Sequence, residues 1–235
     1  MEEMYFDKID KVIYINLEER TDRRKKIENT LKKLFPSDKI IRFDAIKETP
    51  GFIGASKSHI ACLDMAIKKK WTIMIVEDDM EWHSDTETSL KILNKKINNP
   101  FDVIILGGAF PIYNTKTYKL YECNSTTAYI VSSDYCETLK KNMSLGLENL
   151  QLTNNHRLYA LDIYWQKLQK KDNWFIIYPP LCIQKIGYSD IDGNISNPTK
   201  YFFITNNAVY WRRYKKFLLK FIIIIFFVLY YFIIL

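Results

Sequence analysis

Residues Trp71 to Asp79, WTIMIVEDD, form the stretch that decides the fold. Its first six residues are almost wholly apolar, and three acids, Glu77, Asp78 and Asp79, follow at once. A strand buried on both faces of a parallel sheet has such a continuous apolar run. In an open α/β sheet, ligands bind beyond the carboxyl ends of the strands. The stretch therefore predicts a buried strand with a carboxylate cluster at an end where chemistry is expected.

The segments around this strand alternate between strand and helix patterns. Short β-rich runs lie at 12–17, 40–45, 101–106 and 126–131, the third of them ended by two glycines. Apolar residues at helical spacing lie between them, at 21–34, 58–70 and 90–97. Further on, helices are expected at 134–141 and 158–169 and a strand at 174–178, and 187–200 is turn-rich. The alternation predicts one α/β domain, residues 1–200, with a mostly parallel central sheet.

The positive charge of the chain is concentrated near its end. The formal net charge is +7, from 34 Lys and Arg against 27 Asp and Glu. Five of the basic residues and none of the acids lie in 201–235, so 29 basic residues face 27 acids upstream. A basic cluster beside an apolar run favours attraction to anionic lipid headgroups over binding of nucleic acid. We therefore expect no nucleic-acid partner.

The last nineteen residues, 217–235, predict a membrane helix. They are apolar except for Lys220. A span needs about 20 residues, so this segment is long enough if Lys220 reaches back to the headgroups. The alternative is a shallow interfacial or buried helix. With 201–216 as a basic juxtamembrane segment, the positive-inside rule predicts a C-terminally anchored protein whose catalytic domain faces the cytoplasm.

Other site types find little support in the sequence. Cys62, Cys123, Cys136 and Cys182 are widely spaced and have no CxxC pairing, so neither a zinc site nor a disulfide framework is indicated. Residues 1–10 are acidic and mixed, unlike a secretory signal. The sequence also lacks the glycine-rich Lys-Ser/Thr loop that cradles phosphates in many nucleotide hydrolases.

The acidic triplet predicts a site for a hard divalent cation. Alternation along an extended chain would point Glu77 and Asp79 to one side and Asp78 to the other. Mg²⁺ and Mn²⁺ prefer oxygen ligands and often combine few protein carboxylates with water and substrate phosphates. A metal on a diphosphate would stabilise the charge of the leaving group. The alternative is a solvated acidic loop that caps a helix.

Four blocks of the sequence resemble glycosyltransferase family 25, which includes bacterial lipooligosaccharide galactosyltransferases and collagen galactosyltransferases. They are 12–24 (VIYINLEERTDRR), 54–63 (GASKSHIACL), 75–79 (IVEDD) and a looser group with 127–130 (TAYI), 161–162 (LD) and 180–191. The blocks follow the family order. Two positions depart from the family pattern: Ala55 stands where a Cys is usual, and ALDIYW replaces a cleaner Val-Asp pattern around Asp162.

The resemblance implies a GT-A type nucleotide-sugar-binding fold, a UDP-sugar donor and a bound Mn²⁺ or Mg²⁺. We expect transfer of a hexose, galactose or glucose, to a glycan or glycolipid acceptor, as in lipopolysaccharide-type glycan synthesis. The membrane tail favours a lipid-linked acceptor. Two further functions stay open: a non-catalytic membrane-anchored scaffold that keeps the fold, and a metal-dependent phosphoryl-transfer enzyme.

Candidate site residues follow from the resemblance together with position. Glu77 and Asp79 are the expected metal ligands, and the expected donor-binding residues are Asn16, Arg20, Arg23, Ser58 and Asp78. Asp162 is the expected general base of an inverting transfer, because attack by a sugar hydroxyl needs a positioned carboxylate, and His59 is the second catalytic candidate. Gln184, Ser189 and Asp190 are expected to line the acceptor side or to position the metal loop. Structural alternatives stay open for several of these residues: an exposed basic helix start for the arginines, a hydrogen-bonding group for His59 and a helix cap for Asp162.

Overall fold

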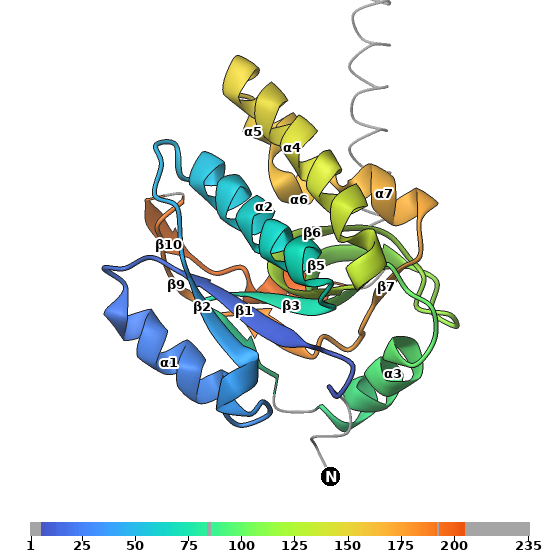
Figure 1. The fold of residues 1–235 in the computed structure, drawn as a ribbon. Coiled ribbons are helices and arrows are strands. Elements are labelled where there is room, and N and C mark those ends of the chain that lie inside the picture. The colour runs from blue at the N-terminus through green and yellow to red at the C-terminus, as the bar shows by residue number, and fades with distance from the viewer. Residues whose placement is uncertain (1–5, 84–85, 192, 205–235) are drawn as a thin grey trace, which may run out of the picture.

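The computed structural model describes residues 6–83, 86–191 and 193–204, and Figure 1 shows their arrangement. A six-stranded sheet forms the centre, in the order β2-β1-β3-β6-β5-β7. Its strands are β1 (Lys11–Asn16), β2 (Ile40–Asp44), β3 (Ile73–Glu77), β5 (Val103–Tyr113), β6 (Leu120–Val131) and β7 (Trp174–Ile176). β1 pairs in parallel with β2 and β3, and β5 with β7, whereas β6 runs antiparallel to both of its neighbours. The prediction of a mostly parallel α/β sheet is confirmed.

The strand order reverses direction between β1 and β3. From β1 the chain passes through α1 (Thr21–Leu31) to β2 on one side, and then through α2 (Gly51–Lys69) to β3 on the other side. At such a switch point the loops after two adjacent parallel strands turn away from each other and leave a crevice. The loops that follow Asn16 and Glu77 therefore border the same crevice.

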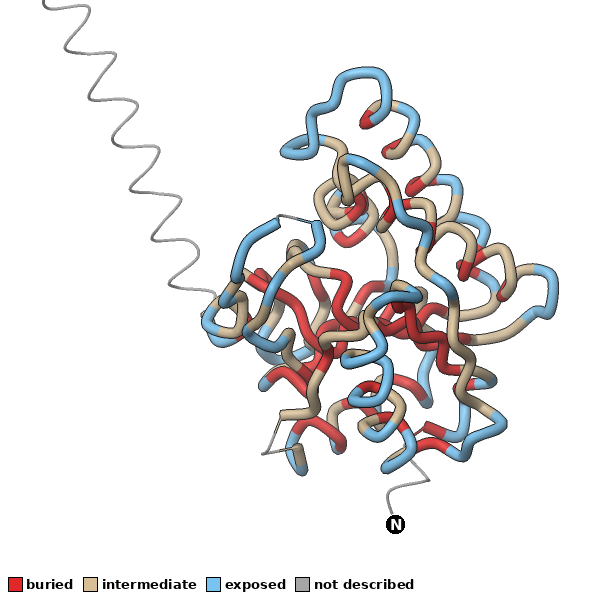
Figure 2. Tube along the Cα trace, turned by 90° about the vertical axis from the view of Figure 1, so that its left-hand side faces the viewer, coloured by how far each residue is buried: buried red, intermediate tan, exposed pale blue. Residues whose placement is uncertain are grey.

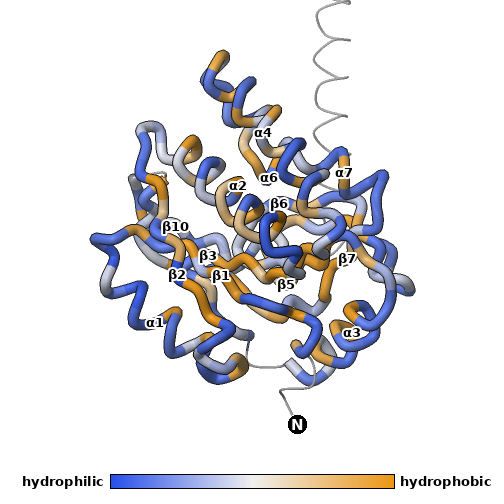
Figure 3. Tube along the Cα trace, viewed as in Figure 1, coloured by the Kyte–Doolittle hydropathy of each residue, from blue (hydrophilic) through white to orange (hydrophobic). Residues whose placement is uncertain are grey.

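Helices cover both faces of the sheet (Figure 1). One face carries α2, α4 (Cys136–Thr153), α6 (Leu161–Tyr164) and α7 (Gln166–Lys171), with α5 (His156–Tyr159) beside α4. The other face carries α1 and α3 (Glu87–Ile97). In β3, Ile73 and Ile75 belong to the first core, whereas Met74 and Val76 belong to the second. The strand is buried on both faces, which explains its unbroken apolar run (Figure 3). Figure 2 shows the buried residues gathered in the interior of the molecule.

Short elements complete the end of the sheet that bears the acids. β4 (Met80–Trp82) begins directly after Asp79 and pairs antiparallel with β8 (Cys182–Gln184). β9 (Gly187–Ser189) and β10 (Asn194–Ser196) form a separate two-stranded hairpin, followed by α8 (Thr199–Phe202). Two short 3-10 turns lie at Ser37–Lys39 and Ser133–Tyr135. The segment after residue 182 is thereby brought back to the loop that follows β3.

Two predicted boundaries were wrong for physical reasons. α2 begins at Gly51 and not at Ser58, whose hydroxyl donates to the Gly54 carbonyl one turn back inside the helix. β5 does not end at its glycines: it continues to Tyr113 through shifts in register. A Cβ on Gly107 would lie 2.2 Å from the Cys182 carbonyl oxygen, so this glycine marks a close approach of two chain segments.

Other boundaries also differ. α4 extends to Thr153, well beyond the predicted 134–141, and the predicted helix at 158–169 is divided into α5, α6 and α7. The predicted membrane helix at 217–235 and residues 205–216 of the basic segment lie outside the described residues. Within the described part of the chain, no helix is both long enough and apolar enough to cross a bilayer.

Candidate active site at the β1 and β3 strand ends

Asn16, the last residue of β1, is a positioning residue at the switch point. Its side-chain amide donates to Asp78 Oδ2 at 2.8 Å and to the Arg20 carbonyl at 3.1 Å. Its oxygen accepts from Arg42 Nε at 3.3 Å, and the residue is only 1% exposed. Both ends of the amide are therefore engaged within the protein. Asn16 lies behind Asp78 and orients it.

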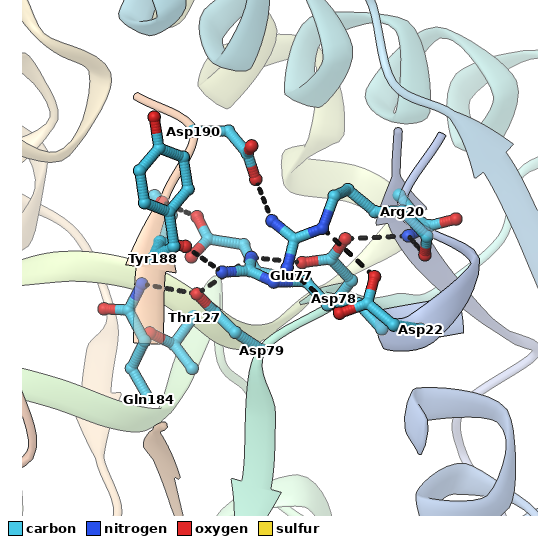
Figure 4. A network of polar contacts seen from close by, with 12 residues as sticks. Arg20, Asp22, Glu77, Asp78, Asp79, Thr127, Gln184, Tyr188 and Asp190 are labelled. Atoms are coloured by element: carbon cyan, nitrogen blue, oxygen red, sulfur yellow. Dashed lines mark hydrogen bonds and ion pairs between the residues drawn. The ribbon is translucent and has the colours of Figure 1, made fainter. Parts of the chain in front are cut away.

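Asp78 and Asp79 share one guanidinium. β3 ends at Glu77, and the next two residues form a turn, so the strand alternation expected from the sequence does not continue. Arg23 Nη1 lies 2.8 Å from Asp78 Oδ1 and 3.4 Å from Asp79 Oδ2. The turn gathers Asp78 and Asp79 around Arg23 (Figure 4), while the charge of Glu77 also acts on Asp79. The prediction of Glu77 and Asp79 as joint metal ligands stays a prediction.

Glu77 points toward β6 and α2. Thr126 donates its hydroxyl to Glu77 Oε1 at 2.5 Å, and His59 Nε2 lies 3.6 Å from the same oxygen. The other ring nitrogen of His59 is 2.9 Å from the Tyr129 hydroxyl. Burial by itself raises the pKa of Glu77, but the bonds and charge of its neighbours, His59 foremost, outweigh it and hold this pKa below the ordinary value. Glu77 thus keeps its negative charge next to the two aspartates.

Asp79 has one oxygen that is satisfied and one that is not. Gln184 Nε2 donates to Oδ2 at 3.1 Å, and the Lys185 amide donates to the Asp79 carbonyl at 2.9 Å. Oδ1 is buried and has no hydrogen-bond partner. Burial, followed by the charge of Glu77, raises the pKa of Asp79 to about 7. The carboxylate is therefore short of positive charge and of one bonding partner.

Two arginines from the start of α1 hold the β9 strand over this region. Arg20 pairs with Asp22 and with Asp190, and Arg23 Nη2 donates to the Tyr188 carbonyl at 2.5 Å (Figure 4). These contacts place Asp190 at the rim of the acidic cluster. Gln184 was predicted to line the acceptor side or to position the metal loop, and its bond to Asp79 fits the second role.

The acids open into a cleft of about 540 Å³. Its floor is formed by Glu77, Asp78, Asp79, Arg23 and Gln184, and its walls by Ile15, Leu17, Glu19, Ala45–Gly51, Ala55, Ser58, His59, Ser189–Ile191 and Gly193. The cleft thus joins an acidic floor to a largely apolar wall. Such a combination is typical of small-molecule sites of roughly 300–1,000 Å³.

Ser58 fixes one wall of the cleft. Its hydroxyl accepts from the Ile46 amide at 2.8 Å, in addition to its bond to Gly54. A Cβ on Gly54 would lie 2.2 Å from the Ile46 carbonyl oxygen. These two residues of the GASKSH segment therefore hold the loop after β2 against α2. The predicted contact of Ser58 with a donor stays a prediction.

Asp162 lies beside the cleft and is not among its lining residues. Its Oδ2 accepts from the Ser125 amide at 3.0 Å, next to the Thr126 that binds Glu77. Burial raises the pKa of Asp162, and the Ser125 bond offsets part of this rise. The structure thus brings Asp162 to the β6 side of Glu77. Arg20 also lies outside the main cleft, in a smaller cavity of about 250 Å³ on the α1 side.

Thr126 and Tyr129 are contacts that the sequence analysis missed. Both lie on the strand predicted at 126–131, but without its antiparallel pairing to β3 nothing placed them beside Glu77 and His59. The same holds for Arg42, which reaches Asn16 from β2. The sequence predicted the strands but not how they pair. These contacts depend on the register of the pairing, so they could not be predicted.

A divalent cation fits the charge of the floor. Three carboxylates face one guanidinium in the cluster, which leaves a formal charge of −2. In the described residues, no three Asp, Glu, His or Cys side chains converge on a single metal position. Asp79, with its free oxygen, and Asp78 would therefore be the protein ligands, and a substrate would have to supply others. Such a ligand set is typical of Mg²⁺, which usually binds one or two protein carboxylates together with substrate phosphates and water.

We expect Arg23→Ala to destabilise the fold far more than Arg24→Ala. The side chains of Arg23, Asp78 and Asp79 are 15, 11 and 16% exposed, so removal of the guanidinium leaves two largely buried carboxylates without their ion pair. Loss of one partner of a buried ion pair costs about 3 kcal/mol or more, which corresponds to a decrease in Tm of about 6–12 °C for a domain of this size. The measurement is thermal unfolding of the full chain in mild detergent.

Arg24 is the matched control, since it pairs with Glu28 at 3.3 Å and is 45% exposed. An exposed pair contributes about 1 kcal/mol or less. Equal decreases in Tm for the two variants would show that Arg23 does not compensate the acids.

Comparisons with known proteins find folds similar to that of this chain at low sequence identity. The sequence matches no protein-family model and no curated protein. A glycosyltransferase involved in the glycosylation of the major capsid of PBCV-1 is 11% identical, with a TM-score of 0.49 over 77% of this chain and 95% of that one. The glycosyltransferase GlyE of Streptococcus pneumoniae TIGR4 is 8% identical, with a TM-score of 0.45 over 88% of this chain and 64% of that one. The CTP:phosphocholine cytidylyltransferase LicC of Streptococcus pneumoniae is 11% identical, with a TM-score of 0.38 over 78% and 76%. Similarity at this level does not carry an activity to this chain, so its function rests on the geometry of the cleft.

Proposed function

We propose that the chain is a metal-dependent glycosyltransferase of the GT-A type, related to family 25, that transfers a hexose from a UDP-sugar to a glycan or glycolipid acceptor. One observation carries the proposal: at the switch point of the sheet, Asp78 and Asp79 form an incompletely compensated carboxylate pair at the floor of a cleft of about 540 Å³. Galactose and glucose are the two candidate sugars.

The donor diphosphate is placed at the acidic floor. Asp79 and Asp78 would hold Mn²⁺ or Mg²⁺, while Gln184 and Arg23 fix the turn that carries them. When bound, the ion would neutralise the diphosphate and stabilise the leaving nucleotide. The apolar wall, with Ile15, Leu17 and Ile46, suits the flat base or sugar face of the donor.

We place the acceptor hydroxyl on the β6 side, where Asp162, which lies beside the cleft and not in its lining, would take its proton as it attacks the anomeric carbon. The donor's bond to the diphosphate breaks in the same step, and configuration is inverted. In support, Asp162 is held by the Ser125 amide and has a raised pKa, as suits a general base. His59 orients Glu77 from the opposite side and is held in turn by Tyr129.

The membrane placement forms part of the proposal. The apolar segment 217–235 anchors the protein, and the basic residues before it keep the catalytic domain on the cytoplasmic side, where nucleotide sugars are made. A lipid-linked acceptor would then be held close to the cleft.

Asp79→Asn is expected to abolish metal-dependent release of UDP, because Asn keeps the shape of the side chain and removes its charge. We would measure nucleotide release from a panel of sugar nucleotides with Mn²⁺ and with EDTA, and Mn²⁺ binding by titration calorimetry. Asp64→Asn is the matched control: Asp64 lies on α2, pairs with Lys140 and is outside the cleft. Full turnover in Asp79→Asn would refute the assignment. Release of phosphate without transfer would favour phosphoryl transfer, and absence of both binding and release in the unaltered protein would favour the scaffold.

Asp162→Asn is expected to lower transfer by about 100-fold or more, the usual worth of a general base, without weakening donor binding. Asn can still accept the Ser125 hydrogen bond, so the fold is kept. The measurement is kcat beside the Kd of UDP. A parallel loss of UDP binding and of Tm would instead give Asp162 a structural role.

Protease treatment tests the orientation. In sealed inside-out vesicles, the cytoplasmic face of the membrane is turned outward. A domain at 1–200 on that face is therefore expected to be digested by added protease. Protection of the domain there, with digestion only after detergent is added, would contradict the cytoplasmic placement.

A further inference from the structure

Exposed apolar side chains are concentrated at the end of the described chain. Ten large hydrophobic residues are exposed in the part that the structure describes, and five of them lie between residues 186 and 203. These five are Ile186, Tyr188, Ile191, Ile195 and Phe203. A soluble surface carries scattered apolar residues, whereas a cluster in one short segment marks a contact surface.

The β9–β10 hairpin presents the most exposed of these residues on one face. Tyr188 and Ile195 are directly opposite in the antiparallel ladder, so their side chains share a face. They are 51 and 80% exposed. Among the described residues the hairpin pairs with no third strand. Because Tyr188 and Ile195 are both exposed, the described residues do not cover the apolar face of the hairpin.

The hairpin is nevertheless held in place. An isolated two-stranded hairpin is only marginally stable, but the Arg23 guanidinium binds the Tyr188 carbonyl and Arg20 binds Asp190. Ser189, Asp190, Ile191 and Gly193 also line the cleft. The hairpin is thus a fixed rim of the cleft with an apolar outer face.

The chain that follows indicates what covers this face. Only seven residues separate Ser196, the end of β10, from Ile204, so the two are at most about 28 Å apart. Thirteen more residues lead to Phe217, the start of the nineteen-residue apolar segment, and five basic residues lie between Arg212 and Lys220. From Ser196 to Phe217 the chain spans 21 residues, about 75 Å at most, so the hairpin is within reach of the surface of a bilayer that holds that segment. Tyrosine is favoured at that depth, where its ring is apolar and its hydroxyl is wet.

We propose that the β9–β10 hairpin docks on the bilayer surface, with Tyr188 and Ile195 inserted among the lipid headgroups, and holds the cleft mouth against the membrane. The cleft would then open toward molecules carried by the bilayer. The membrane contact rests on the membrane placement of 217–235 in the proposed function, and that last consequence rests also on the proposed glycosyltransferase activity.

The test places an environment-sensitive fluorophore on the hairpin of the full chain. All four native cysteines are buried, so a label attaches selectively to Ile195→Cys. Leu152→Cys is the matched control, because Leu152 is 83% exposed and lies on α4. Both proteins are placed singly in nanodiscs of phosphatidylcholine and phosphatidylglycerol that carry a shallow spin-labelled lipid. Because interfacial side chains reach about 5–10 Å into the membrane, we expect quenching about threefold or more stronger at 195 than at 152.

Tyr188→Glu provides a second variant, since it keeps the backbone bond to Arg23 and removes the apolar face. With the label at 195, it should reduce quenching toward the level of the control. Equal quenching at 195 and 152 would overturn the proposal. A blue-shifted label at 195 that lipid spins do not quench would also overturn it, because a protein surface, such as a second copy of the chain, would then cover the face. The quenching measurement needs no donor and no turnover. A negative result therefore counts against the membrane contact alone, whereas full turnover in Asp79→Asn counts against the proposed active site.

Discussion

The contact between the Arg23 guanidinium and two buried carboxylates is the interaction on which the site depends. Asp78 and Asp79 follow a strand whose other residues are packed in the core, so their charges are taken out of water. Burial raises the pKa of Asp78 even with Arg23 and Asn16 bound to it. A buried charge is tolerated when it is paired and hydrogen-bonded. Arg23 can meet this need because α1 begins directly after the loop that follows β1.

The same contact joins parts of the chain that are distant in sequence. Arg23 belongs to the first helix, the acids follow the third strand of the chain, and the Tyr188 carbonyl lies near the end of the domain. Gln184 and the Lys185 amide add two bonds from β8 to Asp79. Gln184 thus completes the floor of the cleft, and Ser189 and Asp190 form part of its wall, although none of the three belongs to the central sheet.

The sequence predicted the elements of the site better than their contacts. The strand at 71–76 and the position of the acids after it were correct, because burial on both faces leaves a clear pattern. Asn16, Arg23 and Gln184 all contact the acids, whereas the predicted contacts of Asn16 and Arg23 with a donor stay predictions. The direction of each carboxylate was not predictable, since a two-residue turn replaces the strand alternation. Gly107 was read as a strand end, because a sequence does not show that another segment, here Cys182, passes within van der Waals contact.

The acids of the site differ in their hydrogen bonding from carboxylates that have a structural role in the same chain. Asp102 accepts from the Asn173 amide at 2.7 Å, and Asp172 accepts from the Tyr135 hydroxyl at 2.5 Å; both join neighbouring segments. Neither has a buried oxygen without a partner, whereas Asp79 does. An orphaned polar atom in the interior costs about 1–3 kcal/mol and needs a reason. The floor of the cleft lacks positive charge and a partner for Asp79 Oδ1. Both would be expected of a site in which the bound substrate and its counter-ion supply them. In the proposed function, a cation and a diphosphate would supply the missing charge and the missing ligand.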